Sequence, residues 1–126
     1  MFLKTALAML LVVFTLQPAA AKIPTAPADL AIEDVATIRN MIIGQLDAFK
    51  RDDAETAFSF AAPKIKQIFR TPEIFLHMVR KSYQAVYRPQ SYSFRTLQRI
   101  DGKIVQPVTI VGPSDITETA LYIIER

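Results

Sequence analysis

The side chains best suited to binding a ligand are concentrated between Tyr83 and Phe94, where tyrosines, a phenylalanine and an arginine follow one another closely. Arg88 directly follows Tyr87 and precedes Tyr92 by four positions. A guanidinium group can bind a carboxylate or phosphate through two parallel hydrogen bonds, while aromatic rings enclose an apolar body. This segment is therefore a candidate wall of a pocket for a small acidic or amphipathic ligand.

A structural role would explain the same residues. Aromatic side chains at the junction of a helix and a sheet usually fill the core, and an arginine there can bind the carbonyl groups at a helix C-terminus. Tyr87 and Tyr92 would then pack in the seam between helix and sheet, and Arg88 would hold the helix end. The sequence alone leaves both interpretations open.

Other catalytic and metal-binding patterns are missing from the sequence. One histidine and no cysteine leave no Cys/His nucleophile pair and no zinc cluster, and the three glycines form no phosphate-binding loop. His77 falls opposite the apolar arc of its helix, as a solvated surface histidine would. The acidic residues Asp52, Asp53 and Glu55 fit helix capping better than calcium binding. We therefore expect no catalytic residue, no metal and no cofactor.

The elements that position the Tyr83 to Phe94 segment begin with helices. Apolar residues recur every three or four positions from Ala31 to Phe49, which predicts a helix with Gln45 at the margin of its apolar stripe and facing inward. Three shorter helices are predicted after it: one capped by Asp52 and ended by Pro63, one over Lys64 to Arg70, and one that starts at Thr71-Pro72-Glu73 and runs to about Tyr83.

Strands follow the helices. Stretches rich in β-branched and aromatic residues predict strands over Ser91–Ile100, Lys103–Val111 and Thr117–Glu125. Asp101-Gly102 between the first two is typical of a tight hairpin turn. The predicted fold class is α+β, with N-terminal helices packed on a curved, cone-like antiparallel β-meander.

The N-terminus predicts an exported protein. Lys4 precedes an apolar run from Thr5 to Leu16, and Ala19 and Ala21 occupy the positions that a signal peptidase reads. The run is shorter than the roughly 20 apolar residues of a spanning helix, and without a cysteine after it a lipid anchor is excluded. We therefore expect a signal peptide over 1–21, a flexible tether over 22–28, a single α+β domain over 29–126, and a periplasmic or secreted location without a stable membrane anchor.

Charge is unevenly distributed along the sequence. The stretch from Pro63 to Lys103 carries nine basic and two acidic residues. Such a stretch can attract anionic groups, although solvated charges that keep the domain soluble would look the same. Because the protein is expected to be exported, nucleic acid is not an expected partner.

Several blocks of the sequence resemble a known family. They are Ile42-Ile-Gly-Gln45-Leu-Asp-Ala-Phe49, the run from Asp52 to Pro63, the run from Phe75 to Arg80, and Val86-Tyr87-Arg88-Pro89. Together they are similar to the small exported bacterial proteins grouped as domain of unknown function 4864. That family in turn resembles the nuclear transport factor 2-like (cystatin-like) superfamily, in which helices wrap a curved sheet and leave a pocket between them. The resemblance implies this fold but carries no established activity.

A pocket of that kind would be lined by residues from the helices and from the helix-to-strand segment. The candidate ligand-binding residues are Gln45, Phe49, Phe58, Tyr83, Tyr87, Arg88 and Tyr92. The function we expect is a non-enzymatic small-ligand-binding or protein-interaction module. The alternative is a small isomerase- or dehydratase-like enzyme, which needs an inward acid or base. Glu118 is the one acid that falls on a predicted apolar face.

A further alternative is a structural partner that pairs through its sheet. Thr119 to Ile124 is apolar, β-prone and uncharged, and such a segment can template pairing with another strand. Members of the resembled family usually continue with a further strand containing Trp, whereas this sequence has no Trp. Either a strand is absent or the sequence is truncated. In the first case we expect the last strand to lack a neighbour in the processed protein and to pair with a second copy in a homo-oligomer or with a strand-donating partner.

Overall fold

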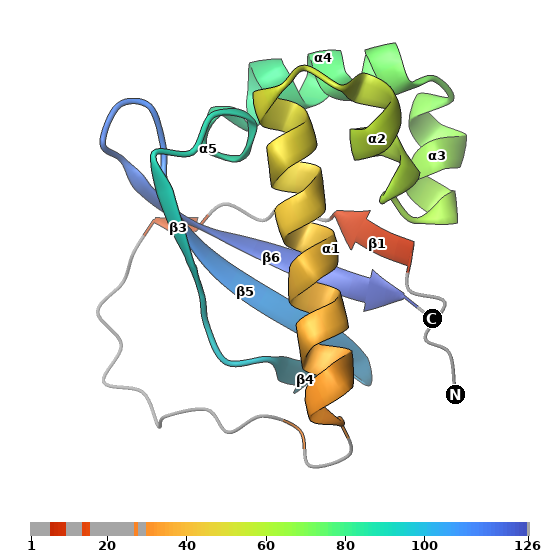
Figure 1. Ribbon diagram of the computed structural model, residues 1–126, viewed down its shortest axis with the longest axis vertical. Coiled ribbons are helices and arrows are strands. Elements are labelled where there is room, and N and C mark those ends of the chain that lie inside the picture. The colour runs from red at the N-terminus through yellow and green to blue at the C-terminus, as the bar shows by residue number, and fades with distance from the viewer. Residues whose placement is uncertain (1–5, 10–13, 16–26, 28–29, 126) are drawn as a thin grey trace.

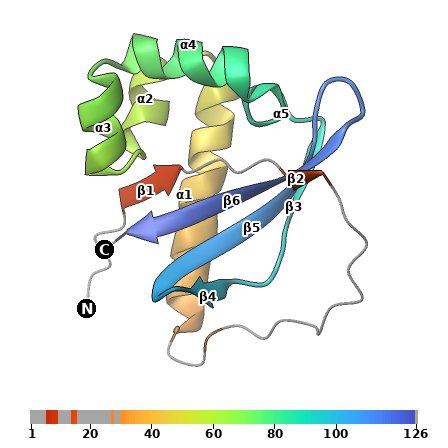
Figure 2. The same ribbon diagram turned by 180° about the vertical axis from the view of Figure 1, so that it is seen from behind.

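The computed structural model describes residues 6–9, 14–15, 27 and 30–125. Two short strands, β1 (Ala6–Met9) and β2 (Phe14–Thr15), precede a series of helices, and the long strands of the sheet follow the helices. The first helix, α1, lies across one face of a curved antiparallel sheet, and the helices α2, α3 and α4 gather near its C-terminal end (Figures 1 and 2). The predicted α+β architecture is therefore confirmed.

Helix α1 (Ile32–Lys50) begins and ends where its apolar repeat predicts. The side chains of Ile38, Ile42, Leu46 and Phe49 recur every three or four residues and are all completely buried. One stripe of the helix thus enters the core against the sheet. Among the described residues, no helix is long and apolar enough to cross a membrane.

Three short helices follow in the predicted order: α2 (Ala54–Ser59), α3 (Pro63–Phe69) and α4 (Pro72–Ser82). A fourth, α5 (Gln84–Tyr87), was not predicted, and the predicted cap of α2 is also corrected. The N-cap of α2 is Asp53, whose carboxylate accepts a hydrogen bond from the Thr56 amide over 3.2 Å, so the prediction that Asp52 caps this helix is wrong. Asp52 instead adopts a φ of 55° in the reversal between α1 and α2, a conformation that aspartate tolerates better than most residues.

The sheet is antiparallel throughout. Strands β3 (Ser91–Phe94), β4 (Gln98–Ile100), β5 (Lys103–Val111) and β6 (Thr117–Glu125) follow the helices. The strand order is β1-β6-β5-β3, with β2 also paired to β6 and β4 also paired to β5. The Asp101-Gly102 turn joins β4 to β5, with both residues at positive φ, as the sequence predicts.

The predicted strand Ser91–Ile100 is interrupted after Phe94, which corrects the sequence prediction. Phe94 pairs with Val108 whereas Gln98 pairs with Val105, so the β3–β4 side carries one extra residue at this point. The physical reason is Pro107 in β5, which has no amide hydrogen to donate to a neighbouring strand. The bulge bends the strand and increases the local twist of the sheet.

The core lies between α1 and the sheet. Alternate residues of β5 and β6 face the helices and are buried, among them Val108, Ile110 and Tyr122. Beyond the end of α1, the buried Phe75 ring of α4 lies 5.3 to 6.0 Å from the rings of Phe49, Phe58 and Phe69. These ring contacts join all four helices α1 to α4.

The N-terminal predictions fall largely outside the described residues. Of the predicted signal peptide over 1–21, the structure describes residues 6–9 and 14–15, and of the predicted tether over 22–28 it describes residue 27. The cleavage site after Ala21 lies outside the described residues.

Candidate functional site

The helix-to-strand segment contains a connected group of polar side chains centred on Arg88. Its Nη1 atom donates hydrogen bonds to the carbonyl oxygens of Phe49 and Tyr87, and its Nη2 atom lies 3.0 Å from Oδ2 of Asp52. The guanidinium carbon lies 4.0 Å from the centre of the Tyr87 ring. Arg88 therefore binds the C-terminal end of α1, far away in sequence, and both of its terminal nitrogens have partners within the protein.

Asp52 receives two donors in this group. The Tyr87 hydroxyl and the Arg88 guanidinium both donate to its carboxylate. The hydrogen bond from Tyr87, with a smaller contribution from Arg88, holds the pKa of this carboxyl below its usual value. The side chains of Asp52, Tyr87 and Arg88 thus serve as hydrogen-bonding partners for one another. This agrees with the structural interpretation of Arg88 as a residue that caps a helix end.

Three of the candidate pocket residues belong to the core. Gln45, Phe49 and Phe58 are buried, and Phe49 and Phe58 contact Phe75. Gln45 faces inward as predicted and donates through Nε2 to the carbonyl oxygen of Ala57 over 3.1 Å. Its Oε1 atom has no hydrogen-bonding partner among the described residues.

The remaining tyrosines lie in different places. Tyr83 is half-buried at the break between α4 and α5, where it packs against the core. Tyr92 lies on β3, where its ring is 6.0 Å from that of Phe94 in an edge-on arrangement. The structure thus divides the seven candidate residues between the core, the Arg88 group and β3. Ligand binding by these residues stays a prediction.

A second polar network, which the sequence reasoning missed, lies between α1 and the sheet. The side chain of Gln106, completely buried in β5, donates to the carbonyl oxygens of Arg95 and Pro107 over 2.7 and 2.8 Å. Its Oε1 atom accepts a hydrogen bond from Nε of Arg39 over 3.2 Å, and the Arg39 guanidinium lies over the Phe94 ring. In the sequence, the feature that could have indicated this network is a glutamine at an inward-facing position of a largely apolar predicted strand.

Tyr122 is the register partner of Gln106 on β6. Its hydroxyl is completely buried and has no hydrogen-bonding partner among the described residues. Burial raises the pKa of this hydroxyl well above its usual value, and the Tyr92 hydroxyl adds to the shift. Glu118, the acid that the sequence places on an apolar face, is half-buried on the same strand.

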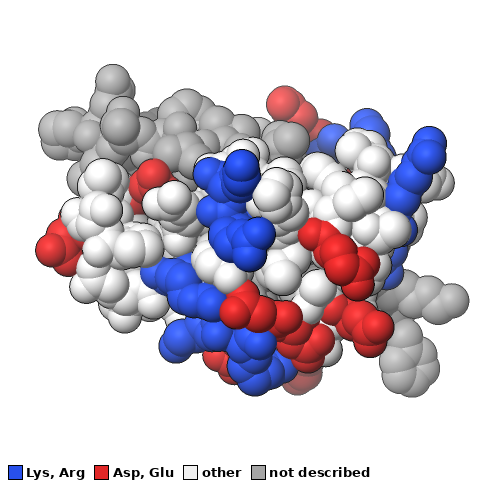
Figure 3. Space-filling view, turned by 90° about the horizontal axis from the view of Figure 1, so that it is seen from above, with Lys and Arg blue, Asp and Glu red and all other residues white. Residues whose placement is uncertain are grey.

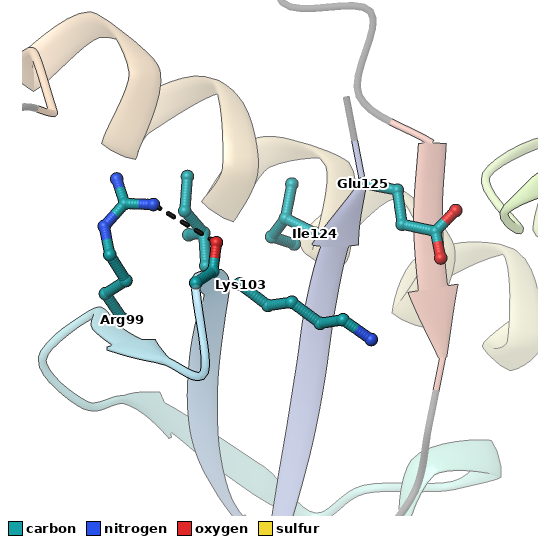
Figure 4. A pocket seen from close by; sticks show the side chains of 6 residues that line it. Arg99, Lys103, Ile124 and Glu125 are labelled. Carbon is teal, nitrogen blue, oxygen red and sulfur yellow. Dashed lines mark hydrogen bonds between the residues drawn. The ribbon is translucent and has the colours of Figure 1, made fainter.

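The structure has a hollow of about 460 Å³ at the end of the sheet formed by the β4–β5 turn and the end of β6. Arg99 and Glu125 lie on opposite sides of it, and Nη1 of Arg99 donates to the carbonyl oxygen of Gly102 (Figure 4). The lining residues are Arg99, Gly102, Lys103, Ile104, Ile124 and Glu125. None of the candidate pocket residues lines this hollow.

Charged side chains of both signs lie beside one another on the face shown in Figure 3. Two ion pairs, Arg88 with Asp52 and Arg51 with Asp53, are formed by described residues. In the part of the chain that the structure describes, no three acidic or histidine side chains are grouped so that they could hold a metal ion.

The edge of β6 that faces away from β5, called the β6 edge below, is occupied by segments of the N-terminal region. Ala6–Met9 pairs antiparallel with Tyr122–Glu125, and Phe14–Thr15 pairs with Glu118–Thr119. These segments lie within the predicted signal peptide. A chain processed after Ala21 would therefore lack both strands, and the unpaired edge expected from the sequence would be open in that form.

The fold is of the α+β class: one helix crosses a curved antiparallel sheet, and the short strands β1 and β2 pair with the outer edge of β6. The chain belongs to the family described as Domain of unknown function (DUF4864), whose model matches residues 31–126. No curated protein and no solved structure matched the chain.

Proposed function

We propose that this protein is exported and serves as a non-enzymatic interaction module that binds an extended polypeptide strand along the β6 edge. The observation that carries the proposal is the antiparallel pairing of β1 and β2 with β6. A strand added to an open sheet edge gains main-chain hydrogen bonds, which supply affinity, and side-chain contacts on alternate positions, which supply specificity.

The location of the occupying strands supports this proposal. Residues 6–9 and 14–15 fall in the segment whose composition predicts a cleaved signal peptide. After cleavage, the backbone donors and acceptors on this side of β6 would lose their partners, and an open edge is a ready template for another strand. The described core residues all lie between Leu30 and Ile124, so the processed chain keeps them all.

The helices lying across a curved sheet are also consistent with the cone-like folds of the nuclear transport factor 2-like superfamily, and we propose that the protein belongs with them. A pocket between helix and sheet is the usual site in such folds. Here the corresponding space holds the buried side chains of Gln106, Tyr122 and Ile42. Binding at the β6 edge is therefore the function we favour over a small ligand in the interior.

The test uses the chain that begins at Lys22 and a peptide copying Thr5 to Thr15, attached to a soluble carrier. We expect saturable binding and slower amide hydrogen exchange in Thr117–Glu125 when the peptide is present. The full-length chain is the matched control, because its own segment already occupies the edge and exchange there should change little.

Two N-methylated peptides make the test specific for strand pairing. Each carries methyl groups on alternate amides, one set on the amides that would point toward β6 and the other on those that would point away. Strand pairing requires that one peptide loses binding and the other keeps it, because only alternate amides of an edge strand face its neighbour. No binding by the unmodified peptide, or equal binding by both methylated peptides, would overturn the proposed function.

A further inference from the structure

Helices α3 and α4 form a basic part of the chain that also exposes large apolar side chains. From Lys64 to Ser82 the sequence has five lysines and arginines and one acid, Glu73. Ile68 near the end of α3 is 59% exposed, and Ile74 in the first turn of α4 is 53% exposed. The kind of partner that these isoleucines could contact therefore depends on which charges lie beside them.

The two lysines of α3 lie on opposite flanks of the helix. Nζ of Lys66 donates a hydrogen bond to the carbonyl oxygen of Ser59, the last residue of α2, over 3.2 Å. Successive residues of a helix are about 100° apart around its axis, so Ile68 lies about 160° from Lys66. Lys64 precedes Ile68 by about one turn and is exposed on the same flank. The flank of α3 turned away from α2 therefore carries Ile68 and Lys64.

Helix α4 separates its acid from its exposed isoleucine. The helix packs against α2, and Arg80 is close enough to Asp52, in the reversal before α2, for their charges to interact. Glu73 precedes Arg80 by about two turns and shares its flank. Ile74 and Lys81 are also about two turns apart, and they lie about 100° to 120° around the axis from Arg80. Ile74 and Lys81 therefore lie together on the flank turned away from α2.

These two flanks meet at the connection between α3 and α4. Two residues separate the helices, and the first of them, Arg70, is exposed. The connection lies at an outer corner of the molecule in both ribbon views (Figures 1 and 2). The surface that combines these three cations and two isoleucines, called the α3–α4 corner below, consists of Lys64, Ile68, Arg70, Ile74 and Lys81.

The chemistry of the α3–α4 corner matches an anionic lipid bilayer. Each lysine or arginine near an anionic bilayer strengthens binding about fivefold, and exposed aliphatic side chains can enter the boundary between headgroups and acyl chains. A bilayer adapts to the surface that it meets. A protein partner instead buries roughly 800 Å² on each side around an apolar centre, for which two isoleucines at a corner are too few.

We propose that the α3–α4 corner holds the protein reversibly on an anionic lipid bilayer. Ile68 and Ile74 enter the headgroup region, and Lys64, Arg70 and Lys81 contact the anionic headgroups. Three cations and two partly inserted side chains give weak binding, so the protein can leave the surface again. This activity is separate from strand pairing at the β6 edge.

The first test asks which part of the molecule touches the bilayer. The sequence has no cysteine, so an environment-sensitive dye can be attached to Ile74→Cys of the full-length chain. Ile116→Cys is the matched control, because Ile116 is 58% exposed in the loop between β5 and β6. Vesicles of equal parts phosphatidylcholine and phosphatidylglycerol should shift the emission at position 74 to shorter wavelengths and leave position 116 unchanged. No shift at position 74, equal shifts at both positions, or an equal shift with pure phosphatidylcholine would overturn the inference.

The second test moves the charge. In the labelled Ile74→Cys chain, Lys64→Glu with Lys81→Glu should raise the lipid concentration needed for half of the shift by at least about tenfold. Lys50→Glu with Lys103→Glu changes the net charge equally at exposed positions outside the corner, and it should raise that concentration less than about threefold. Equal effects of the two pairs would overturn the inference. A shift produced by polyglutamate but not by the vesicles would identify an acidic polypeptide as the partner and overturn the choice of a bilayer.

Discussion

Arg88 and Asp52 are separated by 36 residues, yet Nη2 of the arginine lies 3.0 Å from Oδ2 of the aspartate. The same guanidinium group donates to the Phe49 carbonyl in the last turn of α1. A helix leaves its final carbonyl groups without intrahelical partners, and a cation placed there also interacts favourably with the helix dipole. Arg88 thus fastens the segment leading into β3 to the end of α1.

Replacing Arg88 by alanine should lower the stability of the domain. The change removes the donor to the Phe49 carbonyl and the partner of Asp52, so we expect the free energy of unfolding to fall by about 1 to 3 kcal/mol. Urea denaturation followed by circular dichroism measures the difference. Lys81→Ala, at an exposed position of α4, is the matched control and should change stability by less than about 0.5 kcal/mol. An Arg88→Ala protein as stable as this control would show that Arg88 is free to serve a ligand instead.

Asp52 should make the domain sensitive to acid. Its pKa in the folded state is held below the ordinary value of 3.8, chiefly by the hydrogen bond from Tyr87. When the pKa of a carboxyl is lower in the folded state than in the unfolded state, its contribution to stability is present at a pH above the unfolded-state pKa. That contribution is lost as the pH falls through the folded-state pKa. We therefore expect stability to fall as the pH drops below about 4.

The Asp52→Asn variant checks this assignment. Its free energy of unfolding should depend less on pH below about 4 than that of the wild type, because one carboxyl that gains a proton on unfolding is missing. Some dependence should remain, since hydrogen bonds from Thr56 also lower the pKa of Asp53. Asp47→Asn on the exposed side of α1 is the control. Identical acid profiles for Asp52→Asn and the wild type would show that Asp52 gains nothing from its partners.

The features that could be predicted from the sequence depend on residues close to one another in the chain. The apolar repeat of α1, the Thr71-Pro72 start of α4 and the Asp101-Gly102 turn are local signals, and the structure contains each of them. The helix cap was misplaced by one residue because Asp52 and Asp53 are equivalent as caps. The contacts of Asp52 with Tyr87 and Arg88, which occupy its side chain, are distant in sequence.

The features that could not be predicted depend on the pairing of distant segments. Pro107 interrupts the neighbouring strand at Arg95 through a missing amide hydrogen, which no pattern within Ser91–Ile100 reveals. The network of Gln106 and Arg39 joins two residues 67 positions apart. The candidate pocket residues were grouped by their closeness in sequence or by their apolar face, and the fold then divided them among separate places.

Tyr122 should tolerate, and even benefit from, the loss of its hydroxyl. The hydroxyl is buried without a hydrogen-bonding partner among the described residues, and burying such a group carries a desolvation cost. Tyr122→Phe keeps the ring and should raise the free energy of unfolding by about 1 kcal/mol at neutral pH. Thermal and urea denaturation measure the change. A loss of stability would show that the hydroxyl has a partner in solution.

The same variant should be less sensitive to alkali. Burial raises the folded pKa of Tyr122 above the ordinary value of 10.0. When the pKa of a group is higher in the folded state than in the unfolded state, its contribution to stability is fully present at a pH below the unfolded-state pKa. That contribution is lost as the pH rises toward the folded-state pKa. The wild type should therefore lose stability above about pH 10, and Tyr122→Phe should lose less. Tyr83→Phe, at a half-buried position, is the control for a tyrosine outside the interior of the sheet.

Gln106 should be the most sensitive polar residue of the interior. Gln106→Leu introduces an apolar side chain of similar size. It leaves the Arg39 Nε group without its partner and leaves the Arg95 carbonyl with the longer hydrogen bond from Arg39 Nη2, at 3.3 Å, beside a proline that cannot supply a donor. We expect the free energy of unfolding to fall by about 2 to 4 kcal/mol, because unpaired buried polar groups each cost about 1 to 3 kcal/mol.

A double-mutant cycle separates the two partners of Gln106. Arg39→Met removes the guanidinium group, which donates both to Oε1 of Gln106 and to the Arg95 carbonyl, and it retains an apolar stem over Phe94. The cost of Gln106→Leu should therefore differ between the Arg39→Met background and the wild type. The residual cost then reports the Arg95 carbonyl, which accepts from Gln106 over 2.7 Å at the bulge. Gln67→Leu, at an exposed position of α3, is the matched glutamine control and should change stability by less than about 0.5 kcal/mol. If Gln106→Leu lowers the free energy of unfolding equally in both backgrounds, Gln106 and Arg39 are not energetically coupled. If the loss is as small as in the control, the hydrogen bonds of the Gln106 side chain do not support the bulge between β3 and β4.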